Sequence, residues 1–405
     1  MRGKSERLSI VFISTLLTPH QIPFCQEINN LCEDFTFYQV NDVNNEWVSK
    51  GETIRKSDYC FLQQFSKSEE CEKKIINADI VLIGGCDLSL VKKRLKAGKI
   101  VFVYLERFYK KGISIKNFVR CIVGTYMHHG KYQKYDVNLL CASAYCAGDA
   151  AIFGNYKNRT YKWGYYTKFE ESKLNVDKNQ NQIIWVGRLI DWKHAEYAVE
   201  AMAEIVKHHP DVVLKIYGDG NEKKNLYSLI KQLRLENNVK IMGAVSSENV
   251  RQEMKQSAVF LSTSDYQEGW GAVINEAMNC RCAVVASHAA GSTPFMIKNG
   301  VNGYIYQCGD VQKIADLCKI LIENTDLCKK ISENAYRTIR DIWNPKQAAE
   351  RFIELSKALL NGNKTPFYDD GPCSIAQPIR QKEMYEYIMG DENEKAIMRN
   401  SSVSE

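Results

Sequence analysis

The chain has 405 residues, enough for two domains of ordinary size, and its 45% hydrophobic and 25% charged residues are typical of a globular protein. A formal charge of +6 is too mild to indicate a nucleic-acid binder, and no apolar run approaches the ~20 residues that a transmembrane helix needs. We find no secretory leader, and the fourteen cysteines contain no CxxC pair, so we expect reduced thiols in a cytoplasmic protein.

Short apolar runs alternate with helical patterns along the first half of the chain. Strands are expected at residues 8–14, 35–40, 79–84, 99–105 and 137–143, and helices at about 67–77, 87–97 and 143–152. Fully apolar strands that alternate with helices are typical of a parallel sheet covered on both faces. The first half is therefore predicted to be a doubly wound α/β domain.

The second half repeats this alternation more clearly. A helix is predicted over residues 194–209, where Ala198, Met202, Ile205 and Val206 form one apolar stripe. A second helix is expected at 221–235. The expected strands cover residues 182–187, 212–218, 238–243, 258–263, 282–287 and 302–307.

The junction between the halves is predicted within residues 158–173, a polar and aromatic stretch with no clear period. We therefore expect a first domain at residues 1–165 and a second at 166–343. Two such domains would face each other across a cleft, where ligands bind beyond the carboxyl ends of the strands.

A last helix is predicted over residues 344–362. Asn344 is a suitable N-cap, Pro345 suits the first helical position, and Gly362 suits the end. The remaining residues, 363–405, are expected to form a loosely ordered polar tail.

Two cations follow the first strand of the second domain. Arg188 and Lys193 come where this strand ends and the next helix begins. Cations beside a helix N-terminus are typical of a diphosphate site, because they pair with oxygens while the helix adds oriented N–H groups. The alternative is two solvated surface charges.

Small residues end the neighbouring strands. Gly187, Gly218 and Asp219 belong to turns of a kind that lets the backbone approach a ligand closely. Gly243 and Val245 could present backbone groups to a flat heterocycle. Ordinary strand-to-helix turns are the alternative for all five positions.

The segment EGWGAVINE holds two carboxylates eight positions apart. Glu268 is expected in a loop after a strand, and Glu276 about one and a half turns into the following helix. Between them, the amides of Gly269, Trp270 and Gly271 would point from a helix N-terminus towards an anion, and the small residues would let phosphate oxygens come close. The spacing fits a sugar–diphosphate–nucleoside, with Glu268 on sugar hydroxyls and Glu276 accepting from both ribose hydroxyls.

Four motifs in this half resemble a known family in order and spacing. VGRLIDWK, YGDG, EGWGAVINE and AGSTPFMIKNGVNGYIY are similar to elements of retaining glycosyltransferases of GT-B fold, family 4 (glycosyl transferases group 1). The resemblance covers about residues 180–360, whereas the first half resembles the family mainly in its order of strands and helices.

The resemblance implies two facing Rossmann-like domains, with the last helix returning towards the first. It also implies transfer of a sugar from a nucleotide-sugar donor with retention at the anomeric carbon. Glu268 would meet the donor sugar and Glu276 the ribose, while Arg188 and Lys193 stabilise the leaving diphosphate. No metal and no other cofactor are expected, in agreement with the lack of an Asp-x-Asp pair.

The first domain departs from the family pattern at two loops. STLLTPHQIPF lacks the Gly-Gly pair that members often carry after the first strand, and a later strand ends in Glu106 and Arg107 instead of a His. His20, Glu106, Arg107 and His128 are therefore candidates for the acceptor or donor-sugar side. Structural roles are the alternative, such as an ion pair between Glu106 and Arg107.

Residues 92–120 carry ten Lys and Arg against the single acid Glu106, with aromatic and apolar residues between them. Such a stretch is expected to contact an anionic membrane, at about 1 kcal/mol per basic residue near the surface. A solvated helix face is the alternative. The expected partners are thus a nucleotide-sugar donor, a glycan or lipid-linked acceptor and the inner face of the cell membrane.

The family suggests a role in capsule, lipopolysaccharide or exopolysaccharide assembly, by analogy alone. A nucleotide-sugar epimerase or a phosphorylase of similar shape is a second hypothesis, and a non-catalytic nucleotide- or glycan-binding protein is a third. The joint presence of EGWGAVINE and VGRLIDWK argues against the second and the third hypothesis.

Overall fold

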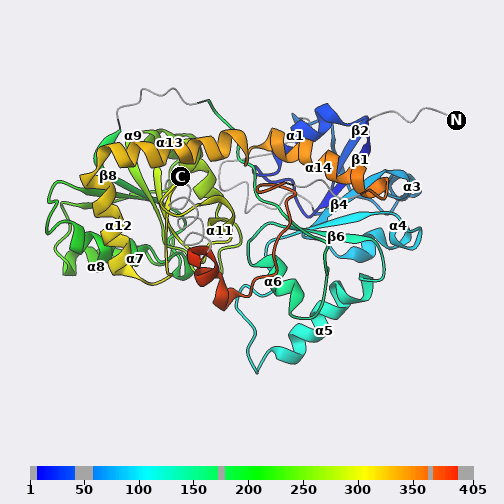
Figure 1. The fold of residues 1–405 in the computed structure, drawn as a ribbon, viewed down its shortest axis with the longest axis horizontal. Coiled ribbons are helices and arrows are strands. Elements are labelled where there is room, and N and C mark those ends of the chain that lie inside the picture. Colours follow the sequence, from blue (N-terminus) through cyan, green and yellow to red (C-terminus); the bar gives the residue numbers. More distant parts are fainter. Residues whose placement is uncertain (1–6, 42–57, 172–177, 364–367, 391–405) are drawn as a thin grey trace, which may run out of the picture. The chain divides into compact units, whose positions relative to one another are not determined.

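The computed structural model describes residues 7–41, 58–171, 178–363 and 368–390, and the chain divides into two compact units (Figure 1). The first unit comprises residues 1–168 and 342–378, and the second comprises 169–341 and 379–405. Each unit is built on one sheet whose paired strands are all parallel. The predicted α/β architecture of two Rossmann-like domains is confirmed.

The first unit contains a seven-stranded sheet of order β3-β2-β1-β4-β5-β6-β7. The five predicted strands are all present, whereas the edge strands β3 and β7 were not predicted, because three residues are too few to show a pattern. The strands are β1 (Ser9–Ser14), β2 (Asp34–Gln39), β3 (Leu62–Gln64), β4 (Ile80–Gly84), β5 (Val101–Leu105), β6 (Val137–Cys141) and β7 (Thr160–Lys162).

The helices of the first unit include one that returns from the far end of the chain. Its α14 packs against α1, and Phe352 of α14 contacts the rings of Phe24 and Phe102 at centroid distances of 6.0 and 5.0 Å. The predicted cap is also present, because the Asn344 side chain accepts from the Gln347 N–H at 2.9 Å. The helices are α1 (Ile22–Leu31), α3 (Glu69–Asn77), α4 (Lys92–Lys96), α5 (Phe118–His128), α6 (Cys146–Ala151) and α14 (Pro345–Leu360).

The second unit contains a six-stranded sheet of order β10-β9-β8-β11-β12-β13, and all six predicted strands are present. They are β8 (Asn179–Val186), β9 (Val213–Tyr217), β10 (Val239–Gly243), β11 (Ser257–Ser262), β12 (Ala283–Ser287) and β13 (Tyr304–Tyr306). The helices are α7 (Ala195–Ile205), α8 (Lys223–Gln232), α9 (Ser247–Gln256), α10 (Ala272–Asn279), α11 (Thr293–Met296), α12 (Val311–Glu323) and α13 (Thr325–Asp341).

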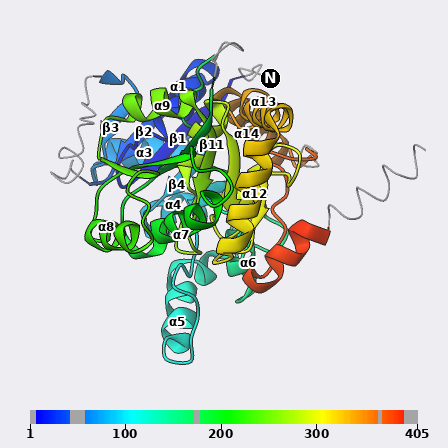
Figure 2. The same cartoon turned by 90° about the vertical axis from the view of Figure 1, so that its left-hand side faces the viewer.

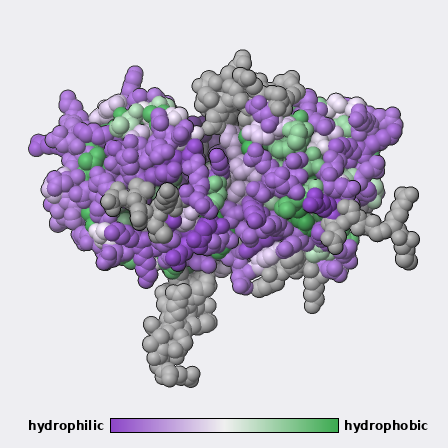
Figure 3. Space-filling model, turned by 90° about the horizontal axis from the view of Figure 1, so that it is seen from above, coloured by the Kyte–Doolittle hydropathy of each residue, from purple (hydrophilic) through white to green (hydrophobic). Residues whose placement is uncertain are grey.

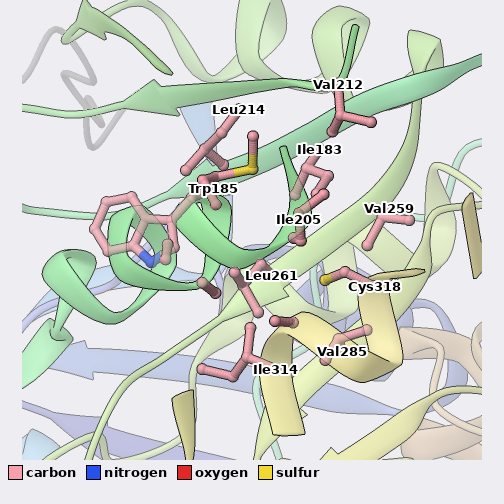
Figure 4. Packing of buried hydrophobic residues seen from close by; sticks show 14 of the residues in the cluster. Ile183, Trp185, Ile205, Val212, Leu214, Val259, Leu261, Val285, Ile314 and Cys318 are labelled. Carbon is pink, nitrogen blue, oxygen red and sulfur yellow. The ribbon is translucent and has the colours of Figure 1, made fainter. Parts of the chain in front are cut away.

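The core of the second unit lies between its sheet and the helices α7 and α12. Figure 4 shows Ile205 of α7 and Ile314 of α12 among alternate residues of β8, β11 and β12. Every second residue of a strand points to the same face, so Ile183 and Trp185 enter this core together. The packing fixes where β8 and β11 end, and therefore where their loops begin.

Part of the segment expected as a loosely ordered tail is instead held on the edge of the first sheet. Residue Lys162 of β7 donates its N–H to Ser374 at 2.7 Å, and Ala376 donates to Thr160 at 3.0 Å. The Lys162 ammonium also pairs with Asp370 at 2.8 Å. This segment therefore covers a strand edge that would otherwise leave backbone groups unpaired.

Most side chains on the face shown in Figure 3 are hydrophilic, with small scattered apolar patches. None of the helices in the described residues combines the length and the apolar composition needed to cross a membrane.

Arg94 offers a test of the first unit's packing. Its fully buried guanidinium donates to five carbonyl oxygens, those of Ile75, Ile76, Ala78, Asp79 and Ile100. We expect Arg94→Leu to lower the free energy of unfolding by roughly 3 kcal/mol, because these carbonyls lose their donor. Urea denaturation measures this, with Lys92→Leu on the exposed side as the control, expected within about 0.5 kcal/mol of wild type. Equal effects of the two substitutions would contradict the assignment.

Candidate active site

The order of strands in the second sheet reverses between β8 and β11. β8 pairs with β9, which follows it in the chain, and on its other side with β11. At such a switch point the loops leave the two strands in opposite directions and open a crevice at their carboxyl ends. Lys193 follows β8 and Glu268 follows β11, so the topology brings these two loops together.

Lys193 and Glu268 form an ion pair at this point, and only 12% of each side chain is exposed. Ser264 donates its hydroxyl to the same carboxylate oxygen at 3.1 Å. A chain of hydrogen bonds fixes the lysine backbone: Trp185 donates Nε1–H to Thr263 at 2.8 Å, and the Thr263 hydroxyl donates to the Lys193 carbonyl at 2.7 Å. The pair is therefore anchored to the core on both sides.

Arg188 lies differently from Lys193. Its side chain is exposed, and its guanidinium carbon lies 5.6 Å from the centroid of the Trp192 ring. The Lys193 ammonium lies 5.0 Å from the same ring, so Trp192 lies beside both predicted cations. The structure places only Lys193 against Glu268.

Glycines are required where the loops after β8 and β9 meet. A Cβ on Gly218 would lie 1.8 Å from the Gly187 oxygen, and one on Gly220 would lie 2.1 Å from the Leu189 oxygen. The Leu189 N–H also donates to the Asp219 carbonyl at 2.9 Å. The predicted glycine turn therefore serves close backbone packing, and the Asp219 carboxylate pairs with Lys223 at 3.0 Å.

The end of β10 continues this edge. Gly218 donates its N–H to the Gly243 carbonyl at 2.9 Å, and Gly243 has a φ of +77°, which favours glycine. Met242 and Val245 are exposed there. An exposed apolar pair beside open backbone suits contact with a flat ring.

The EGWGAVINE loop ends where predicted, with α10 beginning at Ala272 and Gly271 at its N-cap, at a φ of +89°. As a glycine, this N-cap residue offers no side chain to cap the helix. The Trp270 side chain is buried and donates Nε1–H to Asn275 at 2.8 Å, so it anchors the loop instead of facing a ligand. Gly269 is also buried, and Glu276 lies partly exposed on α10.

Two hydroxyls near this N-terminus were not predicted. Ser292 and Thr293 are fully buried, and neither hydroxyl has a hydrogen-bond partner among the described residues. The Ser292 Oγ lies 3.7 Å from the position of a Cβ on Gly271. Only the resemblance in the AGSTPF stretch pointed to this loop.

His194 is a further residue that the sequence did not indicate. Its Nδ1 lies 2.7 Å from the Glu196 carboxylate and its Nε2 lies 3.4 Å from that of Asp265. Hydrogen bonds to Asp265 and Glu196 raise the pKa of His194 to about 9. The protonated ring therefore ties the start of α7 to the loop after β11.

His288 behaves in the opposite way. Burial lowers the pKa of His288 to about 4. The Cys308 N–H donates to its Nδ1 at 3.1 Å, so the proton resides on Nε2 and is donated to the Tyr266 hydroxyl at 2.7 Å. This neutral ring holds Tyr266 in the loop that contains Glu268.

The first unit has a cavity of about 300 Å³ at its own switch point, between β1 and β4. Glu106 lies in its lining, where its carboxylate accepts from Lys110 and from the Tyr165 hydroxyl. Arg107 pairs with the buried Asp149 at 2.9 Å, whereas Glu106 pairs with Lys110, so these partners differ from the Glu106–Arg107 pair considered from the sequence.

The two candidate histidines lie apart. His20 stacks on Tyr165 at a centroid distance of 5.5 Å, and Tyr165 lines the cavity. His128 lies on α5, pairs with Asp87 at 2.7 Å, and is not part of the cavity lining.

No group of three or more His, Cys, Asp or Glu side chains within the described parts of the chain could hold a metal ion. Metal independence remains a prediction.

Comparisons with known proteins give a consistent result. Residues 166–338 match the family model for glycosyl transferases group 1. Poly(glycerol-phosphate) alpha-glucosyltransferase of Bacillus subtilis is 27% identical over 172 residues, 42% of this chain and 25% of that protein. Lipopolysaccharide core biosynthesis glycosyltransferase LpsE of Rhizobium meliloti is 24% identical over 46% of this chain and 52% of that protein. The matched segment spans only about a quarter to a half of these relatives.

Solved structures share the fold over more of the chain. Anabaena Alr3699/HepE, determined in complex with UDP, aligns with a TM-score of 0.66 and 17% identity over 87% of this chain and all of that one. A glycosyltransferase from Rickettsia africae aligns with a TM-score of 0.62 and 18% identity over 88% of this chain and all of that one.

The raised pKa of His194 predicts a pH-dependent stability. A folded pKa of about 9 against an ordinary 6.5 means that the contribution is complete below pH 6.5 and disappears as the pH rises through 9. His194→Asn removes the imidazole and tolerates the residue's φ of +50°. We expect the stability difference between wild type and variant, from urea denaturation, to shrink from pH 6.5 to 9.5. A constant difference would contradict the ion-pair role.

Proposed function

From the match of residues 166–338 to the family model for glycosyl transferases group 1, we propose that the chain is a retaining, metal-independent glycosyltransferase. Its donor is a nucleoside-diphosphate sugar, and its acceptor is a glycan or a lipid-linked glycan. The observation that carries the proposal is the Lys193–Glu268 ion pair at the β8/β11 switch point.

Lys193 and Glu268 have complementary parts in this reaction. When a donor is bound, the Lys193 ammonium turns to the diphosphate and Glu268 accepts hydrogen bonds from hydroxyls of the sugar. As the bond between the anomeric carbon and the diphosphate breaks, negative charge grows on the departing oxygen. A largely buried ammonium stabilises that charge more than a solvated one would.

The remaining donor contacts follow the edge of the sheet. The N-terminus of α10, where the N-cap is a glycine, and the buried Ser292 hydroxyl supply N–H and O–H groups to phosphate oxygens. Arg188 adds a second cation from the surface. Glu276 accepts from the ribose hydroxyls, and the base lies on Gly243 and Val245.

The acceptor hydroxyl attacks the anomeric carbon on the face that the diphosphate leaves. A C–O bond to the acceptor forms, and the hydroxyl proton passes to the departing phosphate oxygen. This transfer needs no oxidant and no protein nucleophile. The first unit's cavity, with Glu106 and Tyr165 in its lining, is the proposed acceptor side.

We assign the enzyme to surface polysaccharide assembly at the inner face of the cell membrane. Two relatives, one named as a lipopolysaccharide core biosynthesis glycosyltransferase and the other as an exopolysaccharide phosphotransferase, support the polysaccharide part of this assignment. An epimerase or a non-catalytic nucleotide- or glycan-binding protein would have to explain the same ion pair without sugar transfer, whereas a phosphorylase would transfer the sugar to inorganic phosphate.

Donor turnover tests the role of Lys193. Wild type is incubated with UDP-, GDP- and ADP-sugars and a mixed acceptor pool, and nucleoside-diphosphate release is measured. We expect Lys193→Ala to slow release on the order of 100-fold, since one lost charge-stabilising group costs about 3 kcal/mol.

Lys215→Ala is the matched control for this experiment, because Lys215 forms a half-buried pair with Glu253 elsewhere in the second unit. It should release nucleotide at close to the wild-type rate. Release that is unaffected by loss of Lys193, or equally reduced in both variants, would contradict the proposed role.

The role of Glu276 is tested by the affinity for a nucleoside diphosphate instead of by the rate of its release. We expect wild type to bind a nucleoside diphosphate about tenfold more tightly than its 2′,3′-dideoxy analogue, because a hydrogen bond to a carboxylate contributes about 1.5–3 kcal/mol. Glu276→Gln should bind the two with similar affinity in a calorimetric titration. If the variant still distinguishes the analogues by tenfold, Glu276 does not bind the ribose.

A further inference from the structure

The helix α5 exposes the apolar residues that a helix normally buries. Thr125 is its one buried residue, whereas Phe118, Val119, Ile122, Val123, Tyr126 and Met127 are all exposed. Val119 is 71% exposed, and Ile115 before the helix is 99% exposed. Positions 115, 119, 122, 123 and 126 follow the helical spacing of a single face, so the exposed residues form one stripe.

The helix is fixed to its own unit by polar side chains and, from the stripe, by Phe118, whose ring centroid lies 6.2 Å from that of Phe153. The Tyr109 hydroxyl lies 2.5 Å from that of Thr125, and His128 pairs with Asp87 at 2.7 Å. In Figures 1 and 2, α5 lies away from the strands of its unit. Apart from Phe118, the side chains of the apolar stripe therefore stay exposed while the helix is already held in place.

The surroundings of the stripe are cationic. No Asp or Glu occurs between Glu106 and Asp136, a stretch that carries seven Lys and Arg. Arg107 is buried in its pair with Asp149, and the others are at least partly exposed. An open groove along this face is lined by Lys116, Arg120 and Lys131 together with Val119, Val123 and Met127. The one acid in the lining, Asp87, pairs with His128.

The surface differs from the stretch 92–120 that the sequence suggested. Arg94 is buried under five carbonyl oxygens, and Lys93 pairs with Glu72 at 2.7 Å. These two cations therefore lie outside the exposed basic and apolar face, which residues 110–131 form.

We propose that residues 110–131 are the membrane-binding element, with the apolar stripe of α5 in the interfacial layer of an anionic lipid surface and the Lys and Arg on phosphate groups. An amphipathic helix with a basic rim binds in this way, through apolar area and electrostatic attraction together. Nucleic acid would satisfy the cations but offer no apolar phase for the stripe. A symmetric dimer through this face would oppose two cationic rims.

The inference rests on the proposed function, because a lipid-linked acceptor would meet the unit that contains the proposed acceptor cavity. The membrane element and the donor site belong to different units, so separate experiments can fail independently.

Vesicle co-sedimentation tests the proposal on the full chain. Wild type should sediment with vesicles of phosphatidylcholine and phosphatidylglycerol, weakly or not at all with pure phosphatidylcholine, and less as salt rises. Two double variants should each lower vesicle binding at least fivefold, roughly the effect of one lost basic residue near the surface. One is Ile122→Ser with Val123→Ser, and the other is Lys116→Glu with Arg120→Glu.

The matched controls lie on α8 of the second unit. Tyr227→Ser removes an equally exposed apolar side chain, and Lys224→Glu with Lys231→Glu changes the net charge by the same amount. These proteins should sediment as wild type does. Circular dichroism confirms that each variant is folded, and calorimetry checks that α5 variants bind a nucleoside diphosphate as wild type does.

The proposal would be overturned if wild type does not sediment with anionic vesicles, or if the α8 controls lose binding equally. It would also be overturned if the serine variant binds vesicles as wild type does, because binding would then depend on charge attraction alone. A dimer that the serine variant converts to a monomer, with vesicle binding unchanged, would assign the face to a second copy. If vesicle binding follows the α5 variants but no donor is ever turned over, the proposed transferase function fails while the membrane element stands.

Discussion

The adjacency of β8 and β11 is the constraint on which the candidate site depends. The two strands are separated in the chain by two strand–helix repeats, yet they pair side by side, and their carboxyl ends bring Lys193 to Glu268. The first unit repeats the rule, because its cavity lies where β1 meets β4. Each unit thus presents one site at the point where its strand order reverses.

The surroundings of the ion pair explain why it suits catalysis better than an ordinary surface pair. Thr263 links the Trp185 indole to the Lys193 backbone, so the ammonium is supported from the core. The loops after β8 and β9 approach each other so closely that a side chain on Gly218 or Gly220 would clash with the facing backbone. Groups fixed in this way need little reorganisation when charge develops near them, which is the basis of electrostatic catalysis.

The features predicted correctly from the sequence are those whose signal is a periodic pattern or the chemistry of neighbouring residues. Apolar runs revealed eleven strands, and Asn344 with Pro345 revealed the start of α14, because these signals are contained in neighbouring residues. Arg107 was misjudged because its partner, Asp149, lies 42 positions away. The α5 helix was missed because periodicity analysis assumes that an apolar stripe faces a core, and here it faces outwards. His194 acquires its role only through Asp265, which the fold brings to it.

The most direct test of the central claim is hydrogen–deuterium exchange with and without UDP, GDP and ADP. The account predicts that at least one nucleotide protects backbone amides in residues 187–194 and 264–276, the two loops that meet at the β8/β11 switch point. It also predicts no protection around residues 14–18 and 84–85 of the first unit. Protection confined to the first unit, or none with any nucleotide, would contradict the assignment of the donor site.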